Sequence, residues 1–154
     1  MFRINAGACA SRVLSLLAVV QFIVQVTGTA ANAAPTPQEV HFKRGESFAI
    51  LQGTLKGWDL KEYSLRANKG QRLRLQVTSR RINWLIVRLY PANQSSGDND
   101  LLNSDNNNMF KWEGPLPAGG EYVLRLFIRR TEARRGGSVN YRVKLAIAPG
   151  EQPK

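Results

Sequence analysis

Apolar and polar residues alternate with a period of two along much of the chain, and this alternation limits the possible folds more than any other feature. In the segment QRLRLQVTS, Leu73, Leu75 and Val77 alternate with arginine and glutamine, and the segments EYVLRLFI and YRVKLAI repeat the pattern. A period of two sends successive side chains to opposite faces of a β-strand. These segments are therefore predicted to be strands with one buried face and one solvated face.

The residues between these segments also favour strands. Turn-forming clusters rich in glycine, such as Asn68-Lys69-Gly70 and Pro117-Ala118-Gly119-Gly120, separate the alternating segments. The segment Trp84 to Tyr90 is apolar on both faces, which predicts a central strand covered on each side. No stretch shows a capped pattern of helical period. The prediction is an all-β fold, a single antiparallel β-sandwich or flattened barrel of seven to eight strands.

The first 33 residues have the layout of a cleavable secretory signal. Arg3 and Arg12 precede an apolar run from Val13 to Val26, and the small-residue sequence Ala31-Asn32-Ala33 follows. The apolar run is shorter than the ~20 residues that a membrane-spanning helix needs. We expect residues 1–33 to be a signal peptide and residues 34–154 to be one exported domain without a membrane span.

The mature chain is basic and has no cysteine. The only cysteine, Cys9, lies in the predicted signal, so an exported domain without disulfides must be stabilised by its packed core. Two of the 22 Lys and Arg residues lie in the signal and all 11 acidic residues follow it, which leaves a net charge of +9. Such a charge attracts anionic partners without identifying them.

Nothing in the chain predicts an enzyme. The single histidine, His41, is expected near the start of the first strand and has no nucleophile motif such as G-x-S-x-G around it. A glycosidase needs two carboxylates across a cleft. Glu113, Glu121 and Glu132 are the available acids, but each is placed among turn or strand-edge residues.

Cofactor, metal and nucleic-acid sites are not expected either. The polar loop from Asn93 to Asn108 carries Asp98, Asp100 and Asp105, but its leucines stand where a calcium loop needs ligands and glycine. Basic strands with tryptophans nearby could bind nucleic acid. Export argues against that partner, and the tryptophans have ready core roles.

The segment RRTEARRGGS, from Arg129 to Ser138, has four arginines within seven residues and then a Gly-Gly pair. A solvated hairpin tip is one interpretation, because charge at such a tip opposes aggregation. The other is a docking surface, because guanidinium pairs bidentately with carboxylate and phosphate, which ammonium cannot do. The absence of lysine from this segment favours docking.

Specific motifs resemble the periplasmic inhibitors of g-type lysozyme. The similarity covers VHFKRGES from Val40 to Ser47, GWDLKEYSLRANKGQ from Gly57 to Gln71, and LPAGGEYVLR, RTEAR and YRVKLAI between Pro117 and Ile147. The resemblance implies a β-sandwich without enzymatic activity that acts in the periplasm. Its implied partner is a g-type lysozyme.

In that family, a Ser-Gly-x-Tyr motif and a loop with two arginines four residues apart enter the lysozyme cleft. The resemblance assigns these roles to Gly120, Tyr122, Arg130 and Arg134, with Gly119 at the position of the serine. It further suggests that Tyr122 supports the base of the arginine loop. Inhibition is then expected to be competitive occlusion of the cleft.

The alternative is a non-enzymatic module of the pre-peptidase C-terminal type. That class shares the pattern G-Q-x-L-x-L-x-V followed by G-x-Y-x-L-R-L. Such a module would bind cell-wall glycan or another polyanion, with Trp58 or Trp112 as stacking platforms.

Overall fold

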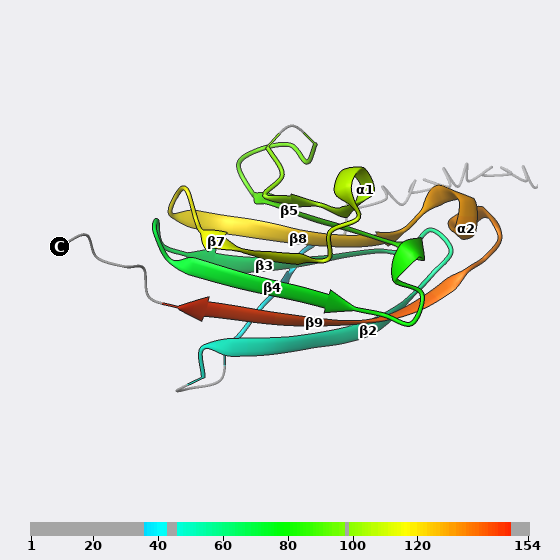
Figure 1. The fold of residues 1–154 in the computed structure, drawn as a ribbon, viewed down its shortest axis with the longest axis horizontal. Helices are drawn as coiled ribbons and strands as arrows, with labels where there is room; N and C mark the ends of the chain where they lie inside the picture. The colour runs from blue at the N-terminus through cyan, green and yellow to red at the C-terminus, as the bar shows by residue number, and fades with distance from the viewer. Residues whose placement is uncertain (1–35, 43–45, 98, 149–154) are drawn as a thin grey trace, which may run out of the picture. The chain divides into compact units, whose positions relative to one another are not determined.

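Two β-sheets account for most of the regular structure in residues 36–42, 46–97 and 99–148, which are the residues that the computed structural model describes (Figure 1). One sheet has five strands in the order β1-β3-β8-β5-β6, and the other has four in the order β2-β9-β4-β7. Every neighbouring pair is antiparallel except β1 and β3, which are parallel. The predicted signal peptide, residues 1–33, lies outside the described residues.

The strands and helices have the following bounds. The strands are β1 Gln38–Glu39, β2 Phe48–Lys56, β3 Leu60–Ala67, β4 Arg72–Thr78, β5 Leu85–Pro91, β6 Leu102–Asn103, β7 Lys111–Pro115, β8 Gly120–Ile128 and β9 Ser138–Ala148. The helical segments are the 3-10 turn η1 Ile82–Trp84 and the short helices α1 Ser104–Asn107 and α2 Arg130–Arg134. In the described part of the chain, no helix is long and apolar enough to cross a membrane.

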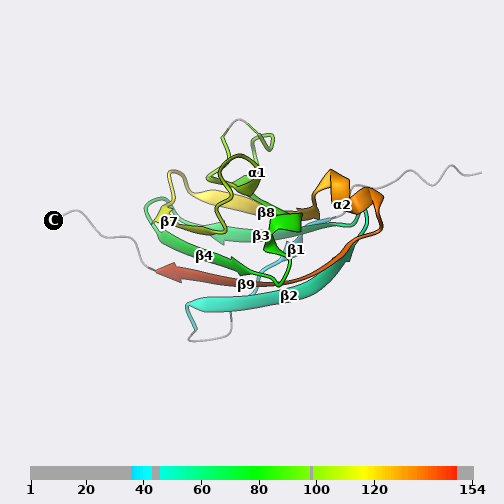
Figure 2. The same ribbon diagram turned by 45° about the vertical axis from the view of Figure 1, so that its right-hand side comes forward.

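The two sheets lie against one another as layers (Figures 1 and 2). One hydrophobic core takes side chains from both of them. The alternating leucines and valine of β4 are buried while its arginines and glutamine are exposed, and β9 buries its predicted inward residues except Ile147, which is half-buried.

Strand β8 buries its predicted apolar positions, but its other face is not solvated as expected: Val123 is 7% exposed, and Arg125 and Phe127 are half-buried. Leu124 of β8 and Leu145 of β9 are 0% exposed. The period of two thus predicted which side chains face the core, but not that the outer face of β8 is largely covered.

The all-β prediction is confirmed, with differences in detail. The described strands form two open sheets and not a closed barrel. There are nine of them, against the seven to eight predicted, because β1 and β6 are two-residue strands, too short to show an alternating pattern. His41 was placed wrongly: it lies between β1 and β2 and outside both.

The polar segment from Asn93 to Asn108 is not one long loop, as its composition suggested. It contains β6 and α1, and the hydroxyl of Ser104 accepts a hydrogen bond of 2.8 Å from the backbone N–H of Val87 on β5. Leu102 and Ser104 are each 1% exposed. Strand β5 is consequently buried on both faces, as the apolar segment predicted, although Trp84 itself belongs to η1.

Candidate functional site

The arginine-rich segment forms helix α2, a single turn between β8 and β9, and not the simple hairpin turn that the sequence suggested. Arg130 and Arg134 are its first and last residues, and both are exposed. Residues four apart in a helix lie on the same face. Arg130 and Arg134, the two arginines that the resemblance singles out, therefore project from one face of the helix.

The Gly-Gly pair holds the end of this helix. Gly136 has a φ of 69°, in the left-handed region that glycine adopts without strain. Its N–H donates to the carbonyl of Ala133 at 3.0 Å, and the N–H of Gly137 donates to the carbonyl of Glu132 at 2.9 Å. Together these bonds make a Schellman motif, a standard way to end a helix. A Cβ on Gly137 would lie only 2.9 Å from the Glu132 oxygen, so the position has no room for a side chain.

The start of α2 is fixed to the neighbouring η1 segment. The backbone N–H of Arg129 donates to the carbonyl of Trp84 at 2.7 Å, and the side chain of Arg129 lies 3.3 Å from Asp105 of α1. Ala133, in the middle of the helix, is only 3% exposed and belongs to the core. A one-turn helix is unstable alone. These contacts hold α2 in one position.

Charge is distributed unevenly over the helix. Arg129 pairs with Asp105, and Arg135 lies 3.5 Å from Glu132. In the part of the chain that the structure describes, Arg130 and Arg134 form no ion pair with a carboxylate. Arg130 and Arg134 are thus available to an acidic partner, whereas Arg129 and Arg135 pair with acids of the domain itself.

An exposed tryptophan lies beside α2. The turn between β2 and β3 contacts the helix through Gly57, whose N–H donates to the carbonyl of Gly137 at 2.8 Å. The next residue, Trp58, is 65% exposed, the largest exposed fraction among the large hydrophobic residues described. Sequence reasoning gave Trp58 a core role, or a stacking role in the nucleic-acid and glycan-binding alternatives. Its position between glycine and aspartate in a turn was the signal that it is not a core residue.

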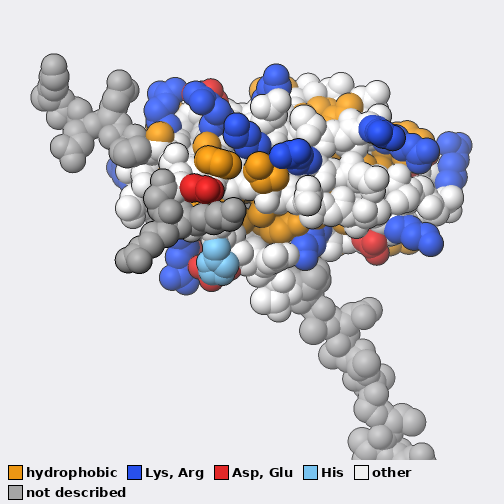
Figure 3. Space-filling model, turned by 90° about the horizontal axis from the view of Figure 1, so that it is seen from below, with side chains coloured by type: hydrophobic (Ala, Val, Ile, Leu, Met, Phe, Trp, Pro, Cys, Tyr) orange, Lys and Arg blue, Asp and Glu red, His pale blue; other side chains and the backbone are white. Residues whose placement is uncertain are grey.

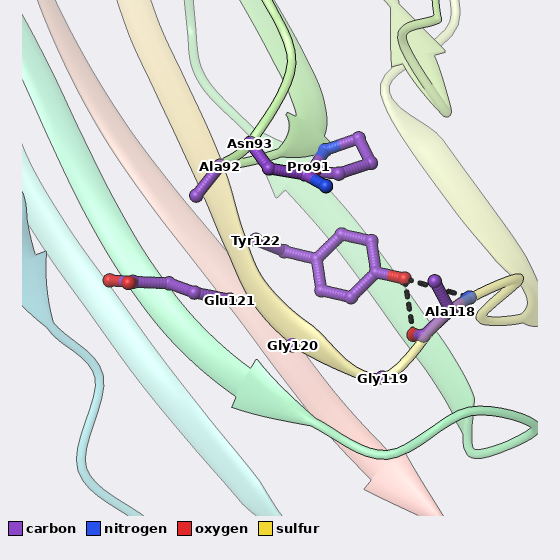
Figure 4. A pocket seen from close by; sticks show the side chains of 8 residues that line it. All are labelled: Pro91, Ala92, Asn93, Ala118, Gly119, Gly120, Glu121 and Tyr122. Atoms are coloured by element: carbon purple, nitrogen blue, oxygen red, sulfur yellow. Dashed lines mark hydrogen bonds between the residues drawn. The ribbon is translucent and has the colours of Figure 1, made fainter.

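Tyr122, Gly119 and Gly120 lie at the other end of β8. The hydroxyl of Tyr122 donates to the carbonyl of Ala118 at 2.7 Å and accepts from the N–H of Ala118 at 3.3 Å (Figure 4). Residues 91–93 and 118–122 line a surface pocket of about 400 Å³ there. Tyr122 is 1% exposed, so it supports the turn that precedes β8 and offers little surface to a partner.

The expectation that Tyr122 supports the base of the arginine segment is therefore wrong. Strand β8 runs for nine residues, from Gly120 in the glycine turn, Pro117 to Gly120, to Ile128 just before α2. At 3.4 Å per residue, the two ends are ~27 Å apart. The structure brings Arg130 and Arg134 together and separates them from Gly119, Gly120 and Tyr122.

The three acids considered above, Glu113, Glu121 and Glu132, lie on different elements of the described structure. Glu113 accepts two hydrogen bonds from Arg74, at 2.6 and 2.9 Å, and this bidentate contact lowers the pKa of its carboxyl. Glu132 lies beside Arg135 in α2, and Glu121 is exposed on β8. Carboxylates that are placed this way do not face one another across a cleft, as glycoside hydrolysis requires.

Several known proteins resemble this chain in sequence and in fold. The inhibitor of g-type lysozyme from Escherichia coli K12 is 26% identical over 136 residues, which covers 88% of this chain and 98% of the relative. The crystal structure of a periplasmic inhibitor of g-type lysozyme from Aeromonas hydrophila is 27% identical. It has a TM-score of 0.63 and covers 73% of this chain and 96% of its own. No protein-family model matches the chain.

A structural likeness also exists to the class considered as the alternative. The pre-peptidase C-terminal domain of a collagenase from Bacillus anthracis covers 77% of this chain and all of its own, with a TM-score of 0.54 and 14% identity. Identity that low shows a common fold alone. The relatives with higher identity are inhibitors of g-type lysozyme, which agrees with the prediction that this chain is not an enzyme. The chain is thus similar, in sequence and in fold, to the inhibitors of g-type lysozyme, and the resemblance carried by its motifs is confirmed.

Proposed function

We propose that the mature protein is a β-sandwich inhibitor of g-type lysozyme, exported to the periplasm by its signal peptide. The relatives described above carry that activity in their names, and the structural relative is periplasmic. The single observation that carries the mechanism is the pair Arg130 and Arg134, exposed on one face of a helix that the domain holds firmly.

The mechanism is occlusion of the enzyme's groove by α2. A lysozyme must hold an acidic carboxyl that protonates the glycosidic oxygen, together with further acidic groups that organise water or substrate. Two guanidinium groups delivered by one rigid surface would pair with those carboxylates and fill the space of the substrate. Trp58 offers an exposed aromatic side chain in the turn that is hydrogen-bonded, through Gly57, to the segment that follows α2. Interfaces commonly use tryptophan and arginine as their main anchors.

Two different effects of charge follow from this mechanism. The net charge of the domain accelerates the encounter and is weakened by salt, whereas removal of one partner from a desolvated ion pair costs ~2–5 kcal/mol and accelerates dissociation. Arg130→Ala and Arg134→Ala should therefore each raise the dissociation rate at least about tenfold, which corresponds to ~1.4 kcal/mol. The matched control is Arg66→Ala at the far end of β3, which is exposed and should change only the association rate.

The test combines a lytic assay with binding kinetics. Lysis of a bacterial suspension by g-type, c-type and i-type lysozymes is followed by turbidity with and without the mature protein. The same variants are then measured by surface plasmon resonance on g-type lysozyme. Protection confined to the g-type enzyme supports the proposal. Full lysis by that enzyme in excess protein would refute it, and equal dissociation rates for Arg134→Ala and Arg66→Ala would refute the role of α2.

Binding of cell-wall glycan remains the second candidate, because Trp58 is exposed as a stacking platform requires. Retention of the protein on insoluble peptidoglycan, lost in Trp58→Ala, would favour that candidate. Retention on immobilised g-type lysozyme without retention on peptidoglycan favours inhibition.

A further inference from the structure

The outer face of the four-stranded sheet is strongly basic. The outward positions of β2, β9, β4 and β7 carry six cations and, among the described residues, a single acid, Glu113. The six cations are Lys56, Arg72, Arg74, Lys111, Arg142 and Lys144. Glu113 is bound by Arg74 and lies 3.8 Å from Arg72. The other four cations form no ion pair with an acid in the part of the chain that the structure describes. Neither the core nor the inhibitory surface, which is the face of α2 that carries Arg130 and Arg134, accounts for this concentration of charge.

Two large apolar side chains are exposed on the same face. Phe48 is 40% exposed and Ile50 is 44% exposed, and both point outward from β2. Lys144 of β9 stands directly opposite Ile50, and its ammonium nitrogen lies 5.7 Å from the centre of the Phe48 ring. Hydrophobic and cationic side chains adjoin on the surface that Figure 3 shows. The apolar pair is therefore bordered by positive charge.

A shallow hollow joins the two kinds of side chain. It has a volume of about 230 Å³, and its lining includes Ile50, Arg142 and Lys144. The pairing register puts Ile50, Lys144, Gln76 and Lys111 in one row across the sheet. Cations thus stand at the same level as exposed apolar atoms in the middle of the face.

We propose that this face docks the protein on a bilayer surface that contains anionic phospholipids. Lysine and arginine near such a surface are attracted by the phosphate and carboxylate groups of the lipids. Exposed apolar side chains at the same level enter the boundary between headgroups and acyl chains, as they do in amphipathic interfacial segments. A soluble polyanion would contact the cations alone. Binding to such a partner would not explain why Phe48 and Ile50 are exposed on the same face.

Membrane docking leaves the inhibitory surface accessible. Helix α2 lies in the connection between β8 and β9, at one end of the strands, whereas Ile50 and Lys144 lie within the sheet (Figure 2). The protein would then be concentrated at the membrane with α2 still open to solvent. Docking does not depend on the proposed inhibition, so either can fail without the other.

The expected affinity follows from the net charge of the face. Each Lys or Arg near a strongly anionic membrane strengthens binding by about fivefold, which corresponds to ~1 kcal/mol. The double variant Arg142→Gln/Lys144→Gln should therefore lower the partition coefficient onto anionic vesicles about 25-fold. The control Arg66→Gln/Lys69→Gln removes two exposed cations from β3 and the turn after it, outside this face, and should change partitioning no more than about twofold.

Sedimentation with lipid vesicles tests the proposal. The mature protein is mixed with vesicles of phosphatidylcholine alone, or with ~30% phosphatidylglycerol, at low and at physiological salt. We expect binding only to the anionic vesicles, and weaker binding for the Arg142→Gln/Lys144→Gln variant. The variant Phe48→Thr/Ile50→Thr keeps residue types that suit strands. It should lose at least about tenfold in vesicle binding, with unchanged binding to the soluble polyanion dextran sulfate.

Three results would overturn membrane docking. The first is the absence of binding to anionic vesicles by a folded protein, with the fold checked by circular dichroism. The second is equal loss in the control and the Arg142→Gln/Lys144→Gln variants. The third is equal vesicle binding by Phe48→Thr/Ile50→Thr and the unchanged protein, which would assign the face to soluble polyanions.

Discussion

At the scale of single residues, the contact between Tyr63 and Tyr141 links the two sheets. Tyr63 belongs to β3 and Tyr141 to β9, and their hydroxyl oxygens are 2.7 Å apart in a buried environment. Burial raises the pKa of Tyr141, with the hydrogen bond to Tyr63 as a further cause, so the Tyr141 hydroxyl is protonated at neutral pH. Gly53 makes room for the pair, because a Cβ there would lie 2.6 Å from the Tyr141 hydroxyl.

Removal of one of these hydroxyls should destabilise the domain. In Tyr141→Phe the hydroxyl of Tyr63 is left buried without this partner, which costs ~1–3 kcal/mol. The double variant Tyr63→Phe/Tyr141→Phe leaves no orphaned hydroxyl, so it should be less destabilised than the sum of the single variants. Urea unfolding, followed by tryptophan fluorescence, measures all three free energies. Strictly additive losses would show that the two hydroxyls do not interact.

At the scale of elements, the strands could be predicted and the helix could not. Alternation identified the buried faces of β4, β8 and β9, because each is long enough to repeat a period of two several times. Helix α2 has five residues, which is too few to show a period of 3.6. The Gly-Gly pair after it was interpreted as a hairpin turn, although glycine at that position also ends a helix.

The Schellman motif of α2 should matter for inhibition as well as for stability. In Gly136→Ala a non-glycine residue must adopt a φ of 69°, which costs ~1–2 kcal/mol, or the end of α2 must rearrange. We expect weaker inhibition of g-type lysozyme, because Arg130 and Arg134 would no longer be held in one orientation. The measurement is the inhibition constant in the lytic assay, beside the free energy of unfolding.

Gly70→Ala is the matched control for that variant. Gly70 also has a positive φ, 83°, with no atom within 4 Å of an added Cβ, but it lies in the turn between β3 and β4. It should lose similar stability and keep its inhibition constant. If the two variants inhibit equally well, the rigidity of α2 has no part in the mechanism.

At the scale of the whole molecule, strand β8 separates the surface near Tyr122 from the surface near Arg130, which sequence analysis had assigned to one site. Tyr122 and Arg130 are eight positions apart, and that short interval suggested a common site. An extended strand turns those positions into opposite ends of the domain, because each residue advances the chain by ~3.4 Å. Sequence similarity could point to the arginines, but only the geometry shows that α2 lies near Trp58 and away from Gly119.

The two ends can be distinguished by attachment of a bulky polymer to each. The mature chain has no cysteine of its own, so Thr131→Cys in α2 and Ala118→Cys in the glycine turn each give one labelling site; both positions are exposed. Polyethylene glycol on residue 131 should abolish inhibition by blocking the entry of α2, whereas the same polymer on residue 118 should leave the inhibition constant within about threefold, a difference of ~0.7 kcal/mol. The unlabelled cysteine variants serve as controls for the substitutions. Loss of inhibition on labelling at residue 118 alone would place the glycine turn, and not Arg130 and Arg134, in the groove of the lysozyme.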